Sequence, residues 1–262
     1  MRIFYQSVAA LGEDPLWKDY EKALGERIFS VKRPETEVEV KGVKVMIPQA
    51  TEYSYLEYLN VSQILDHGAR AEEEGYEGFI LGCMTDPGHD ILRSILDIPV
   101  IFAGETSMHL ACLIGKKFGF VARTERTADR IFANVRDYGL LERALPSTFL
   151  DISLEALARG FKDPTLVFDP FYEKCGELIA RGADVIIPGC GILNVLLAVN
   201  KVNRYQDAMI LDTIGSLVKV AEFMVELQQK LSLRVSRRGV YSSPRKEVME
   251  QAKKALMKTS SD

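Results

Sequence analysis

The chain has 262 residues, of which 47% are hydrophobic and 27% charged, and its formal net charge is −4. This composition is typical of a globular protein with a substantial core and differs from that of disordered chains. The charge balance gives no reason to expect nucleic acid or an anionic membrane as partner. No apolar run approaches the roughly 20 residues that cross a bilayer.

The four cysteines and the start of the chain bear on the compartment. None of the cysteines has the CxxC spacing of a structural zinc site, and together they form no disulfide framework. The first residues enter a strand-like pattern without a signal peptide. We therefore expect reduced thiols, no metal, and a soluble cytoplasmic protein.

Short apolar segments alternate with longer amphipathic ones along the chain, which predicts an α/β fold with parallel sheets. Strands are predicted at Arg2–Ser7, Gly78–Leu81, Val100–Ala103, Phe118–Ala122, Val185–Pro188 and Ala208–Leu211. Helices are predicted at about Leu56–Gly75, Asp90–Leu96, Glu105–Lys116, Arg126–Tyr138, Phe171–Arg181 and Ile214–Leu231. The segment Glu37–Met46 alternates valine with charged residues, as an edge strand or a hairpin does.

The C-terminal tail, Arg234–Asp262, is basic and polar but carries apolar residues at helical spacing. It is interpreted as a docked terminal helix or a contact between subunits rather than a nucleic-acid-binding segment. We expect a homo-oligomer.

A weak internal repeat links two parts of the sequence. Residues 76–83 read YEGFILGC and residues 183–190 read ADVIIPGC, so a Gly-Cys pair ends a predicted strand in both. Each pair is followed by a helical segment and a further strand. The repeat predicts two matched half-molecules that each present one cysteine, Cys83 and Cys190, at the same place.

The carboxyl ends of parallel strands are where open α/β sheets bind ligands. A helix that starts there directs free N–H groups and the positive end of its dipole at the site. Asp86 and Pro87 are suited to start such a helix after Cys83. We therefore expect both thiols to have a pKa below the free value of about 8.5.

The string GCMTDPG at residues 82–88, followed by Ile98-Pro99-Val100 and Gly104–Met108, resembles the aspartate/glutamate/hydantoin racemase superfamily. Together with PGCG at residues 188–191, it is most similar to the hydantoin racemase branch. The resemblance covers most of residues 1–231. It implies two similar α/β lobes with mostly parallel sheets, with the substrate in the cleft between them and one cysteine from each lobe. It also implies that no cofactor is used.

A racemase must remove a proton from one face of a carbon and deliver another to the opposite face. Cys83 and Cys190 are the expected acid and base, with backbone N–H groups of Met84, Thr85, Gly191 and Ile192 as donors to the enolate oxygen. By position in the family, the other substrate-binding residues are expected to be Gln6, Ser7, Arg123 and Thr124. Hydantoin racemases often carry Thr-Thr or a similar pair at the latter position, and an Arg123 that faces the cleft would favour an anionic substrate.

The sequence thus predicts a cofactor-independent racemase of a 5-substituted hydantoin or a related small cyclic amide. An aspartate- or glutamate-type amino-acid racemase and a non-catalytic small-molecule binding protein are the alternatives. A decarboxylase of the same superfamily keeps one cysteine, so the presence of both counts against it. The first lobe is expected to comprise residues 1–98 and 212–262, and the second residues 99–211.

Overall fold

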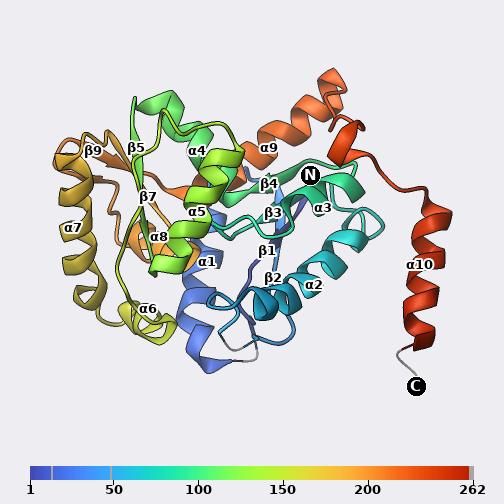
Figure 1. Cartoon of the computed structure of the whole chain (residues 1–262), viewed down its shortest axis with the longest axis horizontal. Helices are drawn as coiled ribbons and strands as arrows, with labels where there is room; N and C mark the ends of the chain where they lie inside the picture. The colour runs from blue at the N-terminus through green and yellow to red at the C-terminus, as the bar shows by residue number, and fades with distance from the viewer. Residues whose placement is uncertain (13, 48, 260–262) are drawn as a thin grey trace.

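The computed structural model describes residues 1–12, 14–47 and 49–259, and its strands form two sheets with helices packed on them (Figure 1). Through the first sheet the chain runs β1 (Arg2–Gln6), α1 (Lys18–Val31), β2 (Glu37–Lys41), α2 (Ser54–Ala71), β3 (Gly78–Leu81), α3 (His89–Ile95) and β4 (Val100–Phe102). It continues with α4 (Ala103–Ile114), β5 (Phe118–Ala122), α5 (Glu125–Asp137), β6 (Thr148–Phe149), α6 (Leu154–Gly160), α7 (Thr165–Ala180), β7 (Val185–Pro188), α8 (Gly191–Val199), β8 (Arg204–Tyr205), β9 (Ala208–Ile210), α9 (Thr213–Leu231) and α10 (Lys246–Thr259).

The first sheet has the order β2-β1-β3-β4 and all its pairs are parallel. The second has the order β6-β5-β7-β9-β8, and within it β8 runs antiparallel to β9. The predicted α/β fold with two mostly parallel sheets is therefore confirmed.

The central strands are buried on both faces, which is why they read as continuous apolar runs rather than alternating ones. All residues of β3, β5 and β7 are buried. Helices α1 and α9 pack against each other. Helix α1 also packs on α8, which follows strand β7 of the second sheet. One hydrophobic core consequently includes Ile3 of the first sheet and Ile187 of the second.

The six predicted strands and six predicted helices are all present, with ends shifted by a few residues. Glu37–Lys41 forms an edge strand parallel to β1, so the hairpin alternative is wrong. Helix α7 begins at Thr165 rather than Phe171 and contains Pro170 in its interior. A proline is normally accommodated in the first helical turn, which makes the residues after it resemble a helix start.

The division of the chain into lobes stays a prediction. Strand β4, which that division assigned to the second lobe, pairs with β3 through Phe79 and Val100 in the first sheet. We therefore propose a boundary after Phe102 rather than after Ile98.

At the C-terminus, α10 follows the connector 232–245 and lies at the periphery of the molecule (Figure 1). Residues 260–262 of the tail lie outside the described part of the chain. In that described part, no helix combines the length and the apolar composition needed to cross a membrane.

Candidate active site

A small cavity of about 80 Å³ lies where the carboxyl ends of strands from both sheets meet. Cys83 follows β3 of the first sheet, and Cys190 follows β7 of the second. Both cysteines line the cavity, which brings together two residues 107 positions apart in the sequence. The cavity walls are formed by Ser7, Val8, Ala9, Tyr20, Met46, Thr51, Gly82, Cys83, Met84, Thr85, Arg123, Thr127, Leu154, Gly189, Cys190, Gly191 and Ile192.

Close packing against a buried side chain or the backbone explains the glycine that precedes each cysteine. A Cβ atom at Gly82 would lie 2.1 Å from the Tyr5 hydroxyl, and one at Gly189 would lie 2.8 Å from Cα of Ala122. A Cβ atom at Gly191 would lie 2.8 Å from the carbonyl oxygen of Gly82. Only glycine fits such approaches, so the two cysteine-bearing segments touch across the cleft.

Cys83 is held in a setting that favours the neutral thiol. Its Sγ atom lies 3.3 Å from Oγ1 of Thr85 in a hydrogen bond. Burial raises the pKa of the Cys83 thiol to about 11, although the hydrogen bonds with Thr85 act in the opposite direction. The expectation of a lowered pKa is wrong for Cys83, because the loss of hydration outweighs the nearby hydrogen bonds.

Cys190 has a different local environment. It is the residue immediately before α8, in an extended conformation, and the helix starts at Gly191. The first N–H groups of a helix have no partner within it, and the positive end of the helix dipole lies there. Cys190 therefore stands at the end of α8 that carries its unpaired N–H groups. Helix α3 instead starts six residues after Cys83, at His89.

Tyr20 forms part of the cavity wall beside both cysteines, and the sequence analysis did not identify it. Its side chain is buried, and burial raises the pKa of its phenol well above the ordinary value, while a hydrogen bond with Ser7 opposes the shift. A neutral phenol is a hydrogen-bond donor at neutral pH. The spacing of Tyr20, Ala23, Leu24 and Ile28 along α1 was the signal that would have placed it on a buried face.

Arg123 lines the cavity, as the anionic-substrate alternative requires, but its charge is already neutralised. Its guanidinium forms an ion pair with Glu52 and donates hydrogen bonds to Oγ1 of Thr51 (2.8 Å) and to the carbonyl of Ile152 (3.0 Å). Only 6% of the Arg123 residue surface is exposed. The arginine thus serves to hold the segment Thr51–Glu52 over the cavity.

The other predicted binding residues divide into two groups. Ser7, Met84, Thr85, Gly191 and Ile192 line the cavity. Gln6 and Thr124 are described by the structure but form no part of the cavity wall. Gln6 is buried and contacts His67 (Oε1 to Nδ1, 2.7 Å), and the Thr124 side chain caps α5.

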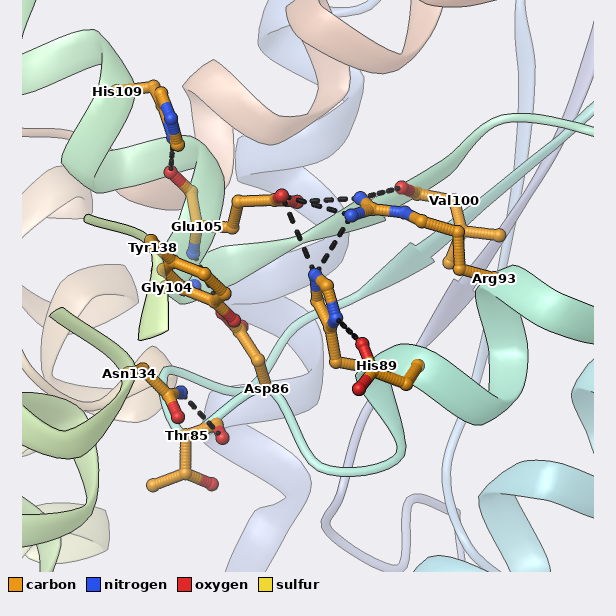
Figure 2. Close-up of polar contacts among 11 residues, drawn as sticks. Thr85, Asp86, His89, Arg93, Val100, Gly104, Glu105, His109, Asn134 and Tyr138 are labelled. Atoms are coloured by element: carbon orange, nitrogen blue, oxygen red, sulfur yellow. Dashed lines mark hydrogen bonds and ion pairs between the residues drawn. The ribbon is translucent and has the colours of Figure 1, made fainter. Parts of the chain in front are cut away.

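Asp86 was expected to start the helix after Cys83, and this expectation is wrong. Residue Gly88 precedes α3, while the buried Asp86 carboxylate accepts hydrogen bonds from the N–H groups of Gly104 and Glu105, both 2.7 Å. It therefore caps α4, which is distant in sequence. The Tyr138 hydroxyl also donates to Asp86, at 2.8 Å (Figure 2).

Beside the loop Cys83–Gly88, which contains Asp86, lies a charged network that joins α3 to α4 (Figure 2). Arg93 donates two hydrogen bonds to the Glu105 carboxylate (2.9 and 2.6 Å), and His89 lies 3.5 Å from it. Burial opposes ionisation, but these partners lower the pKa of Glu105 to about 2. The network joins α3 to α4, and its three side chains form no part of the described cavity wall.

A family model described as "Asp/Glu/Hydantoin racemase" matches residues 19–221. Hydantoin racemase of Pseudomonas sp. (strain NS671) is 26% identical over 209 residues, which cover 78% of this chain and 80% of that protein. Hydantoin racemase of Paenarthrobacter aurescens is 22% identical over 71% of this chain and 77% of its own.

Solved structures show the same fold. Allantoin racemase from Klebsiella pneumoniae superimposes with a TM-score of 0.78 at 24% identity, over 94% of both chains. Glutamate racemase RacE1 from Bacillus anthracis superimposes with a TM-score of 0.64 at 15% identity, over 87% of this chain and 82% of its own. The family match spans well over half of the sequence and includes both cysteine segments. The chain therefore belongs to the Asp/Glu/hydantoin racemase family, and it is a racemase.

Proposed function

We propose that this racemase interconverts the enantiomers of a 5-substituted hydantoin, or a related small cyclic amide, with Cys83 and Cys190 as acid and base and without a cofactor. The observation that carries the proposal is the position of the two Gly-Cys pairs. They end strands of different sheets and face one cavity, so a ring between them has one thiol on each face.

The reaction balances without any further reactant. The Cys190 thiolate removes the proton from the ring carbon beside the carbonyl, and the electron pair of the C–H bond moves onto oxygen as an enolate. The Cys83 thiol then gives its proton to the opposite face of that carbon. Cys83 is left as thiolate and Cys190 as thiol, which is the state required for the mirror-image substrate.

The unequal settings of the cysteines support these starting roles. Cys190 stands at the N-terminus of α8, where an anion is stabilised, and the raised pKa of Cys83 keeps its proton in place. The developing enolate oxygen is served by backbone N–H groups after each cysteine and by the neutral Tyr20 phenol. Such fixed donors are most effective in a cavity that excludes water.

The charge in the cavity favours a neutral substrate. Arg123 is the one ionisable side chain with a permanent charge among the residues of the described cavity wall, and Glu52 neutralises it. Val8, Met46 and Leu154 provide apolar surface for a substituent. A free acidic amino acid has no unpaired cation to bind here, which makes amino-acid racemisation the second candidate.

The test is the loss of optical rotation from pure enantiomers of 5-substituted hydantoins beside those of aspartate and glutamate. We expect racemisation of hydantoins, retained after exhaustive chelation and abolished in Cys83→Ala and Cys190→Ala. The matched control Cys112→Ala replaces a half-buried thiol in α4 and should keep full activity. Full activity in either active-site variant would refute the mechanism, and activity on amino acids alone would refute the substrate.

A further inference from the structure

One face of α5 contacts the opposite half of the molecule along its whole length. Arg126, Arg130 and Asn134 follow one another at four-residue steps and so lie on one stripe of the helix, and the capping residue Tyr138 extends the series by one step. Arg126 donates to the carbonyl of Thr51 (3.0 Å), and Arg130 lies 3.2 Å from Glu57. These two arginines hold the start of α2, whereas the other two residues reach a different segment.

Asn134 and Tyr138 contact the loop that carries Cys83. Asn134 donates its side-chain N–H to the carbonyl of Thr85 at 2.9 Å, and Tyr138 donates its hydroxyl to Asp86 at 2.8 Å (Figure 2). Thr85 is the residue whose hydroxyl lies 3.3 Å from Cys83 Sγ. One hydrogen bond therefore separates Asn134 from the residue that orients the thiol.

The loop has a conformation that needs such support. Asp86 has a φ of +46°, in the left-handed region that residues other than glycine seldom adopt. Its carboxylate is fixed from two sides, by the N–H groups at the start of α4 and by Tyr138, the residue that follows α5. Loss of one partner leaves a buried acceptor with reduced hydrogen bonding, which destabilises this conformation.

We propose that Asn134 and Tyr138 are positioning residues that hold the loop Cys83–Gly88, and with it the Cys83 thiol, in the geometry required for proton transfer. The proposal rests on the proposed function in so far as Cys83 is one of the two acid–base groups. A purely structural role in joining the two halves is the alternative, and it makes no distinction between the two cysteines.

The measurable consequence is the reactivity of the thiol. Titratable groups around Cys83 are Asp86 on its own loop, Cys190 on the facing segment, Tyr5 of β1 and Tyr20 of α1. Burial is the main reason for the raised pKa of the Cys83 thiol. When the loop is loosened, water reaches the sulfur, so more thiolate forms at a given pH and alkylation becomes faster.

The experiment measures iodoacetamide alkylation of Cys83 and Cys190 in the same sample by peptide mass spectrometry, from pH 7 to 10. The variants are Asn134→Ala and Tyr138→Phe, with Tyr172→Phe in α7 as the matched control. We expect alkylation of Cys83 at pH 8 to increase about tenfold in both variants, its pH midpoint to fall, and Cys190 to react as in the unaltered protein. In parallel, kcat for racemisation should fall at least tenfold with KM changed less than threefold.

Tyr138→Phe removes one hydroxyl and keeps the ring, so it tests the proposal even where Asn134→Ala does not fold. The positioning role would be overturned by an unchanged alkylation rate at Cys83, by equal changes in alkylation rate at both cysteines, or by an unchanged kcat. If the unaltered protein racemises nothing, the proposed function fails, whereas a selective change at Cys83 would still show that α5 holds the loop.

Discussion

Arg123 and Glu52 form an ion pair at the wall of the cavity. The two residues are 71 positions apart, and the ion pair places the Thr51–Glu52 segment against the cavity. An arginine with this little exposure is stable only when a partner compensates its charge. The sequence indicated that Arg123 follows a strand, but its partner could be identified only from the folded chain.

Glu52→Gln should therefore redirect the enzyme towards anionic substrates. The matched substrates are hydantoin-5-acetic acid and its amide, which differ in charge but little in shape. We expect the ratio of kcat/KM for the acid to that for the amide to rise about tenfold, the effect of roughly 1.4 kcal/mol at a partly solvated site. An unchanged ratio would show that Arg123 does not act on the bound ligand.

Gly191 tests how closely the two cysteine segments must approach. In Gly191→Ala the new Cβ would lie 2.8 Å from the carbonyl oxygen of Gly82, so the segments must separate. We expect kcat to fall at least tenfold. The control is Gly176→Ala in α7, where a Cβ meets nothing within 4 Å; there activity should be unchanged and stability should rise by about 0.5–1 kcal/mol. Full activity in Gly191→Ala would contradict the close contact.

At the level of elements, α3 and α4 are joined by charge rather than by apolar packing alone. Arg93 of α3 binds Glu105 in the first turn of α4, and His89 is the third member of the network. The pKa of Glu105 is about 2 in the folded protein, below its ordinary value of 4.5. The unfolded chain thus binds more protons between these values, and stability falls as the pH falls.

The contribution of Glu105 to the free energy of unfolding should be fully present above pH 4.5 and lost as the pH decreases towards 2. A shift of this size corresponds to at most about 3 kcal/mol. Urea unfolding at pH 5 and pH 3 should show that Glu105→Gln is clearly less stable than the unaltered protein at pH 5 and closer to it at pH 3. The exposed Glu73→Gln is the control. An equal difference at both pH values would contradict the assignment.

Elements with a strong pattern could be predicted from the sequence, because burial on both faces gives β3, β5 and β7 continuous apolar runs. The two-residue strands β6 and β8 could not, since two residues are too few for a periodic pattern; β6 pairs with β5, and β8 forms a short hairpin with β9. Helix α1 was missed although its apolar residues have helical spacing. That omission also removed Tyr20 from the predicted site.

For the whole molecule, the repeated Gly-Cys ending predicted both the two sheets and the residues that meet between them. What the sequence could not provide is the relative placement of the two halves. That placement determines the burial of Cys83, the partner of Arg123 and the contacts of α5 with the loop Cys83–Gly88. Asn134 and Thr85 are 49 positions apart in the sequence, and Arg123 and Glu52 are 71 positions apart. No local sequence pattern can indicate contacts over such separations.

The proposed two-base mechanism assigns each cysteine to one face of the substrate. Its most direct test is proton NMR in heavy water, with each pure hydantoin enantiomer incubated with Cys83→Ala or Cys190→Ala. The remaining thiol can still remove and return a proton on its own side, so one variant should exchange the α-proton of one enantiomer with retention, and the other variant that of the mirror image. Exchange of the same enantiomer by both variants would contradict the two-base mechanism.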